Sequence, residues 1–431
     1  MIKKLERKIY ALSKEWGSRI GLDLPYFVKN GFWVAVRQGI GMVSGLALSV
    51  AFARLATQEV FGQYQFVLSV LSVVSIVSIP GFNTAITQSV ARGYDGEYKK
   101  VVRMSFFWSL LGTPILLLIG GYYYIYQSHP LGVAFMIASV FFPFFYAPNT
   151  WDAFLQGKGR FDVSARFGSI QSIISSIVTI VVIFSNGDDL IRIIVTYLFS
   201  YAFLNGLFYW KAGKYLDNNR IEKGNIKYGY FLSLINLFNF AGSNIDKIVI
   251  GILLGAEEVA AYTIISMIAF RLKDLLKTFN SMLLPKFATL DSSLIVFFRT
   301  HRIKLVMMFI ASLVIGSGYY FAVSYINDLL FGSQYSQYSQ YSRIFAITIF
   351  FALPTTFLGY YAAAKKNKLS IIIVNPVFYA IKIIINIYFV YRFGLAGAVV
   401  SFNISMFIWF LLSLISIIWE ELNLKEANKT A

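Results

Sequence analysis

The sequence contains no cysteine and only two histidines among its 431 residues. Without cysteine the chain forms no disulfide and offers no thiolate ligand to a metal. His129 and His301 lie far apart in the chain, which disfavours a metal centre built on histidine. We therefore predict neither a metal site nor a cofactor.

Charge is also scarce. Asp, Glu, Lys and Arg make up 14% of the chain, against about a quarter in a soluble domain. Hydrophobic residues make up 57% and aromatic residues 18%, with a mean hydropathy of +0.64. No short apolar core followed by small residues begins the chain, so we expect no cleavable signal peptide. Apolar runs instead recur at 131–146, 170–184, 344–364 and 371–390 and approach or reach the roughly 20 residues that cross a bilayer core.

The apolar runs predict an all-α membrane protein with about twelve transmembrane helices. Because the number of spans is even, both termini lie on the same side of the membrane. The predicted spans are 31–53, 61–82, 104–126, 131–154, 167–185, 190–210, 228–254, 260–284, 305–323, 344–364, 371–391 and 396–418.

Lysine and arginine are distributed unevenly over the predicted loops. With the N-terminus inside, 28 of the 38 Lys and Arg residues fall in inner segments, and only Arg54, Arg192, Arg343 and Arg392 in outer loops. Cytoplasmic loops are enriched in these residues, so both termini are predicted to be cytoplasmic. The formal charge of +17 then reflects contact with anionic membrane lipids rather than with nucleic acid.

A short internal repeat predicts two related halves. LATQEVFGQY at 55–64 aligns without gaps on LLGAEEVAAY at 253–262, with Leu, Glu and Tyr at the same offsets. Six spans separate the copies, so both have the same membrane orientation. We expect two parallel six-helix lobes, 1–217 and 218–431, related by an axis along the membrane normal, with a central cavity between them.

Two further segments have a surface interpretation. Residues 1–24 repeat apolar residues every three or four positions between lysines and arginines, which is typical of a helix lying in the membrane interface. The tract Gln334–Ser342, QYSQYSQYS, has low complexity and is expected to form an outer loop or a short surface helix.

Six segments, in order along the chain, resemble those of one known family. They are ARLATQEVFGQY at 53–64, FNTAITQSVAR at 82–92, LQGKGRFDV at 155–163, NIDKIVIGILLGAEEVAAY at 244–262, LFGSQY at 330–335 and FGLAGAVVS at 393–401. The chain resembles the polysaccharide flippases (O-antigen, Wzx type) of the multidrug/oligosaccharidyl-lipid/polysaccharide exporter superfamily. It departs from the family at 57–58, where Thr-Gln stands in place of the more common Gly-Pro.

The resemblance implies a multi-pass transporter of the bacterial inner (cytoplasmic) membrane that acts in lipopolysaccharide biosynthesis. Its substrate would be an undecaprenyl-diphosphate-linked oligosaccharide, moved from the cytoplasmic to the outer leaflet by alternating access. The glycan polymerase and ligase of the same pathway are candidate protein partners, and membrane lipids are further partners.

Charged residues inside the predicted spans mark the candidate site. Each lysine or arginine exposed to lipid at mid-membrane costs roughly 2.5–3.5 kcal/mol, so the six present would together cost about 15–20 kcal/mol, more than a typical folding margin. The deep ones must line water or pair with other groups, and polar stripes on several spans point to a common interior. The candidate substrate-binding residues are Arg37, Lys247, Arg271, Lys273, Lys277, Lys382, Asn83, Asn236, Asn239, Asn375, Tyr379 and Asn386, and Asp246 and Asp274 are candidate coupling or ion-pair residues.

Several of these residues also have a structural explanation. Asp246 can neutralise Lys247, and Asp274 can pair with Arg271 or Lys277 at a spacing of three. Lys382 has no acidic residue in its own span and lies about 16 Å from the inner end by helical rise, which makes it the leading ligand candidate. The GxxxG motif at 41–45 indicates close helix packing.

Two other functions fit a polytopic protein. A drug or cation antiporter of the same superfamily needs acidic residues deep in the lumen, whereas the predicted interior holds six cations and two acids. A membrane glycosyltransferase or polymerase needs carboxylates on a sizeable outer loop for acid–base chemistry. The outer acidic pairs, Asp188–Asp189 and Glu257–Glu258, lie on loops of a few residues, so we predict a transporter without catalytic residues.

Overall fold

The computed structural model describes residues 24–281, 287, 294–300, 302–365 and 374–430. This part of the chain consists of helices and turns and contains no strand. The interfacial helix predicted over 1–24 falls almost entirely outside the described residues. The low-complexity tract is helical and folds into η4 (Ser333–Tyr338) and α17 (Ser339–Ile344).

The described residues form twelve helical crossings, the number that the apolar runs predict. Nine described helices are long and apolar enough to span a membrane, and one of them, α19 (Asn375–Thr430), contains two crossings that turn at Gly394. Gly394 has φ 59°, a left-handed conformation that glycine adopts without steric cost. The other ten crossings are α2 (Leu24–Leu55), α3 with α4 (Gln58–Val74, Gly81–Ala91), α5 with α6 (Glu97–Ser109, Gly112–Tyr126), α7 with α8 (His129–Tyr146, Trp151–Gly157), α9 (Phe161–Asn186), α10 (Leu190–Ala212), α11 with α12 (Asn225–Ser243, Ile245–Leu253), α13 (Ala256–Ser281), α16 (Arg302–Phe331) and α18 (Ala346–Ala364). A short helix, α15 (Leu294–Thr300), precedes α16 and is not a crossing.

The second and seventh crossings are broken near their middles. In the second, Ile79 takes φ 58° and is followed by Pro80, which cannot continue the hydrogen-bond ladder, so α4 begins anew at Gly81. The free N–H of Gly81 is satisfied by the Ser233 hydroxyl of α11 at 2.8 Å. At the other break, Asn244 between α11 and α12 donates to Ser72 Oγ at 2.8 Å. The two broken crossings therefore pack against each other.

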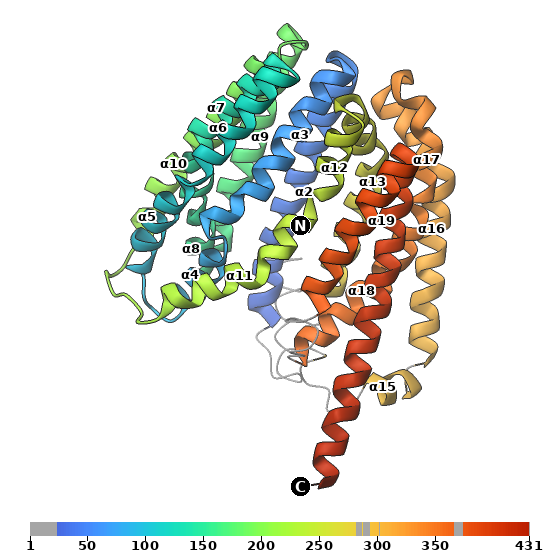
Figure 1. Cartoon of the computed structure of the whole chain (residues 1–431). Coiled ribbons are helices and arrows are strands. Elements are labelled where there is room, and N and C mark those ends of the chain that lie inside the picture. Colours follow the sequence, from blue (N-terminus) through green and yellow to red (C-terminus); the bar gives the residue numbers. More distant parts are fainter. Residues whose placement is uncertain (1–23, 282–286, 288–293, 301, 366–373, 431) are drawn as a thin grey trace, which may run out of the picture.

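The crossings form two groups with a shared middle. Figure 1 shows α5–α10 on one side, α16–α19 on the other, and α2, α3, α12 and α13 between them. Across the middle, α3 packs on α13 and α11 packs on α4. The fold class predicted from the sequence is confirmed, while the boundary at residues 217 and 218 stays a prediction.

The end of the bundle that holds the cationic turns at Arg92, Lys158 and Arg220 is here called the basic end. The other end, here called the opposite end, holds the turns at Gly187, Gly255 and Gly332. At the opposite end the two copies of the repeat meet. Gln58 Nε2 donates to the Glu257 carbonyl at 3.0 Å, and the Cα of Gly62 approaches Ala256 so closely that a Cβ would overlap its carbonyl.

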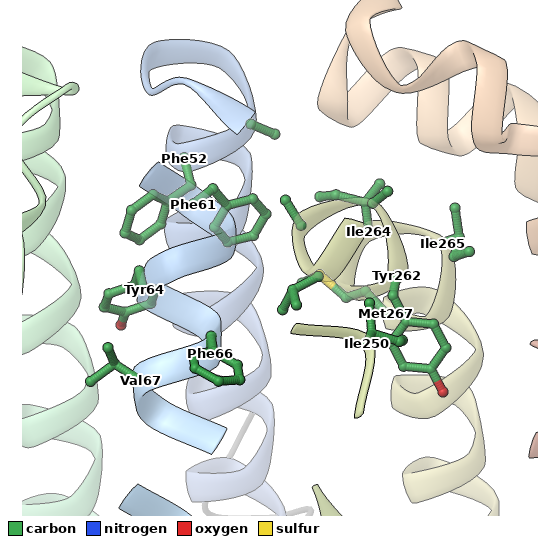
Figure 2. Close-up of a cluster of buried hydrophobic side chains, with 14 of the residues drawn as sticks. Phe52, Phe61, Tyr64, Phe66, Val67, Ile250, Tyr262, Ile264, Ile265 and Met267 are labelled. Atoms are coloured by element: carbon green, nitrogen blue, oxygen red, sulfur yellow. The ribbon is translucent and has the colours of Figure 1, made fainter. Parts of the chain in front are cut away.

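A buried apolar cluster lies just inside the opposite end. Figure 2 shows Phe61 and Phe66 of α3 facing Ile250 of α12 and Met267 of α13. Phe66 lies against Gly251, where a Cβ would come within 2.3 Å of its ring. The cluster joins both lobes, since its members come from helices of both, among them α3, α7 and α10 of the first and α12, α13 and α18 of the second.

At the basic end, the segment between α10 and α11 is fixed to the first lobe. Fully buried Glu97 accepts hydrogen bonds from the Glu222 N–H and the Asn225 amide, both at 3.0 Å. Arg92 binds both carboxylate oxygens of Glu222, and these bonds lower the pKa of that carboxyl. Asp95 accepts from Lys158 at 3.0 Å and from the Asp217 N–H at 2.8 Å. The connection between the lobes is therefore bound to the first lobe.

Candidate functional site

The second lobe contains a cavity of about 710 Å³, here called the C-lobe cavity. Lys273, Asp274 and Lys277 reach it from α13, and Lys382 reaches it from α19. Polar side chains from α11, α18 and α19 complete its wall, among them Asn239, Ser243, Thr355, Thr356 and Ser405. The structure thus brings together six of the predicted site residues. They are Asn239, Lys273, Asp274, Lys277, Tyr379 and Lys382.

Lys382 does not stand alone in this cavity. Its Nζ donates to Asp246 Oδ2 and to the Gly242 carbonyl, both at 2.9 Å, and the two charged side chains are 7% and 5% exposed. The sequence-based pairing of Asp246 with Lys247 is therefore wrong. Asp246 and Lys382 are 136 residues apart in sequence, and only the packing of α12 on α19 makes them neighbours.

Lys247, the residue that was expected to pair with Asp246, points toward the first lobe. Its Nζ donates to Gln65 Oε1 on α3 at 2.8 Å. On a helix, adjacent residues project about 100° apart, so Asp246 and Lys247 of α12 face different neighbours. Lys247 therefore contributes to the contact between the lobes and not to the wall of the C-lobe cavity.

Two of the cavity lysines contact the same aromatic ring. The Nζ atoms of Lys273 and Lys382 both lie 5.2 Å from the centroid of Phe402, and Lys273 is also 5.0 Å from Phe270. Cation–π attraction at these distances offsets part of the cost of burying the ammonium groups. Lys277, one turn further along α13, is exposed. The positive charge of the cavity is thus arranged in depth, from buried Lys382 to accessible Lys277.

The wall opposite the lysines on α13 combines rings and hydrogen-bonding groups. Tyr379 donates its hydroxyl to Asn239 Oδ1 at 2.6 Å. Trp409 lies 5.7 Å from the Tyr379 ring and 4.2 Å, edge-on, from Phe378. Flat rings beside amide and hydroxyl groups offer an apolar surface together with donors and acceptors, the combination that a sugar ring requires.

A second cavity, of about 440 Å³, lies where the lobes meet, and is here called the junction cavity. Arg37 of α2 donates to Asp152 Oδ1 at 2.5 Å and to Ser164 Oγ at 3.2 Å. Arg271 of α13 lines the same cavity and reaches α2 beside Gly45, where a Cβ would lie 2.8 Å from its Nη2. Arg271 is two residues from Lys273, so α13 contributes cations to both cavities.

Asp152 was missed by the sequence reasoning. It lies inside the predicted span 131–154, and an acidic residue within an apolar span is itself a signal. It accepts from Arg37, from Ser164 at 2.5 Å and from Gln156 at 3.0 Å. The interior balance is therefore six cations to three acids, and Arg37 is a paired cation.

Three of the remaining predicted residues, Asn83, Asn375 and Asn386, line neither cavity. Asn386 is 1% exposed and donates to Ser401 Oγ at 2.9 Å, which ties the two halves of α19 together. Asn83 lies on α4, beyond the break at Ile79, and its side chain is exposed. Asn375 is half-buried at the start of α19, and the side chain of Asn236 is outside the described ones.

Comparison with solved structures places the chain in a known architecture. It is similar to an inward-facing multidrug resistance MATE family transporter of the MOP superfamily (12% identity, TM-score 0.62, covering 92% of this chain and 99% of that one). It is also similar to the lipid II flippase MurJ in an inward closed conformation (14% identity, TM-score 0.62, covering 90% and 87%). A third similar structure is a MOP superfamily transporter from Pyrococcus furiosus (12% identity, TM-score 0.57, covering 93% and 96%). At these identities the likeness shows the fold alone, which these membrane transporters share.

Sequence comparison gives the family. Among curated proteins, none matches this sequence significantly. A family model described as polysaccharide biosynthesis protein matches residues 27–291, more than half of the chain. The predicted resemblance is thereby confirmed at the level of a polysaccharide biosynthesis family. The chain belongs to the polysaccharide biosynthesis protein family.

Proposed function

We propose that this protein is a flippase that moves an undecaprenyl-diphosphate-linked oligosaccharide from the cytoplasmic to the outer leaflet of the bacterial inner membrane. The observation that carries the proposal is the charge of the cavities. Lys273, Lys277 and Lys382 line the C-lobe cavity, and Arg271 continues the positive charge into the junction cavity. Lysine and arginine bind phosphate oxygens by charge-assisted hydrogen bonds.

Both parts of such a substrate find matching chemistry. The diphosphate suits Arg271 at the junction between α2 and α13, from which a prenyl chain can remain in the bilayer. The sugars suit the rings and polar groups around Tyr379, Asn239 and Trp409. An inside-negative membrane potential favours outward movement of an anion by roughly 2.3 kcal/mol per charge per 100 mV.

The position of the lobe contacts supports alternating access. At the opposite end, Arg54 donates to the carbonyls of Leu329 and Leu330 at 2.5 and 2.9 Å, and Gln334 donates to the Ala53 carbonyl. The cavity lysines lie much nearer the basic end, because Lys277 is about 30 Å along α13 from Ala256 by helical rise. We propose that the basic end faces the cytoplasm, so that substrate enters there and leaves after the contacts at the opposite end separate.

The test is a flipping assay in liposomes. An undecaprenyl-diphosphate oligosaccharide with a dithionite-quenchable fluorophore on the sugar should cross the bilayer only when the protein is present. Lys273→Gln with Lys277→Gln should slow flipping at least tenfold, while Lys214→Gln, whose Nζ lies over the Trp210 ring at the basic end, should not. Transport of ethidium by the wild type, without flipping of the lipid-linked glycan, would instead identify a cation antiporter and overturn the proposal.

A further inference from the structure

The outer surface of the second lobe has an apolar groove between α16 and α18. Its volume is about 490 Å³, and it shares no residue with either cavity. Both helices are long and apolar enough to span a membrane, so we expect hydrocarbon rather than water around the groove. Its walls are almost wholly apolar. They are formed by Leu313, Gly316, Ser317, Tyr320 and Phe321 of α16 and by Ala346, Ile347, Phe350 and Phe351 of α18.

The groove exists because its floor is made of small residues. Gly316 has no side chain, and a Cβ there would come within 3.3 Å of the Ala346 carbonyl. Large exposed side chains border the floor, with Leu313 58% and Phe321 79% exposed. From 313 to 321 the channel follows one face of α16 for about 12 Å by helical rise. A flexible alkyl chain fits such a shape.

A cation marks one end of the groove. Arg343 of α17 is exposed, its guanidinium carbon lies 5.7 Å from the Tyr320 ring, and its Nε donates to Ser324 Oγ at 2.9 Å. Its two terminal nitrogens have no acceptor among the described residues. The contact with Tyr320 and the bond to Ser324 hold the guanidinium at this end of the groove, and its terminal nitrogens are donors suited to a phosphate.

We propose that this groove is a binding site for an anionic phospholipid, with one acyl chain along α16 and the phosphate on Arg343. The charge of Arg343 selects the headgroup, because a zwitterionic lipid brings a cationic group beside the guanidinium. The site is separate from the cavities of the proposed transport path, so lipid binding there does not depend on whether the protein is a flippase.

The proposal is tested by titrating lipids onto the detergent-purified protein and counting bound lipids by native mass spectrometry. Phosphatidylglycerol should be retained more tightly than phosphatidylcholine with the same acyl chains. Arg343→Gln should weaken phosphatidylglycerol binding about fivefold and leave phosphatidylcholine binding unchanged, because one cation near the surface contributes about that factor. Arg343→Lys should keep most of the preference.

A matched pair of variants tests the chain-binding part. Ser317→Leu fills the floor and should weaken binding of both lipids. Gly318→Leu adds the same side chain one position away, where nothing lies within 4 Å of a Cβ, and should bind lipid as the wild type does. Equal retention of the two lipids by the wild type, or unchanged phosphatidylglycerol binding by Arg343→Gln or Ser317→Leu, would overturn the site.

Discussion

At the scale of single residues, the pairing of Lys382 with Asp246 determines how the C-lobe cavity is charged. Both side chains are more than nine-tenths buried, and Asp246 Oδ1 has no hydrogen-bond partner among the described residues. A buried ion pair gains little over an apolar pair, but removal of one partner leaves an uncompensated charge at a cost of about 3–5 kcal/mol. Lys382 therefore has a structural task besides any contact with substrate.

A double-mutant cycle on this pair separates the two roles. Lys382→Ala and Asp246→Asn should each destabilise the protein by about 3–5 kcal/mol, because each leaves a buried group without its partner. The double variant should cost clearly less than the sum of the two. Thermal or denaturant unfolding of the purified protein in detergent measures all three.

Flipping assays on the same variants complete this test. Normal stability of Lys382→Ala together with lost flipping would contradict the ion-pair account and make Lys382 a substrate ligand alone. If the destabilisation of the double variant equalled the sum of the two single variants, the two side chains would likewise not depend on each other.

At the scale of the helices, small residues make room for interior cations. Gly168 of α9 lies against Arg37 of α2, and Gly45 of α2 lies against Arg271 of α13. The GxxxG motif at 41–45 was predicted to serve helix packing, and Gly41 does lie against Ser172 of α9, with a Cβ position 4.0 Å from its Oγ. Gly45 instead gives Arg271 access to the surface of α2. In this motif, Gly41 therefore serves helix packing and Gly45 makes room for a cation.

This arrangement predicts opposite effects for two similar substitutions. Alanine is favoured over glycine in a helix by about 1 kcal/mol. Gly206→Ala on α10, where nothing lies within 4 Å of a Cβ, should therefore be neutral or stabilising. Gly168→Ala would place a Cβ 2.3 Å from Arg37 Nε and should lower the melting temperature, because Arg37 must leave Asp152 and Ser164. Thermal unfolding of both variants decides this, and a gain of stability in Gly168→Ala would show that Arg37 is not fixed there.

At the scale of the whole molecule, the two ends differ in both charge and contacts. The basic end carries the cationic turns and the bonds that fix the connection between the lobes, such as Arg92 to Glu222. The opposite end holds the contacts between the two repeat copies and the bonds of Arg54 to the end of α16. A single movement that separates the lobes at the opposite end would break the second set and leave the first intact.

The orientation of this bundle in the membrane can be measured directly, because the natural chain has no cysteine. In intact cells, Lys223→Cys should be shielded from a membrane-impermeant thiol reagent, while Glu257→Cys and Ser336→Cys should be labelled. The unsubstituted protein provides a background without signal. Labelling of Lys223→Cys with shielding of the other two would reverse the predicted topology.

Sequence alone determined the class of the protein and its membrane-spanning helices. Each of these follows from local composition, since about 20 apolar residues must form a helix in a bilayer, where the backbone has no other partner for its polar groups. The repeat at 55–64 and 253–262 found the turns that meet at the opposite end, and the lysines of α13 were correctly expected at a cavity.

Tertiary structure alone decided which charges meet. Lys382 pairs with Asp246 across 136 residues, and Arg37 with Asp152 across 115. A pattern on one helix shows which side chains share a face, but not which helix that face meets. The breaks at Ile79 and Asn244 also redirect the faces partway along a crossing, so that Asn83 leaves the interior. The free-energy cost of burying a charge depends on its partner, and which residue is the partner is decided only when the helices pack.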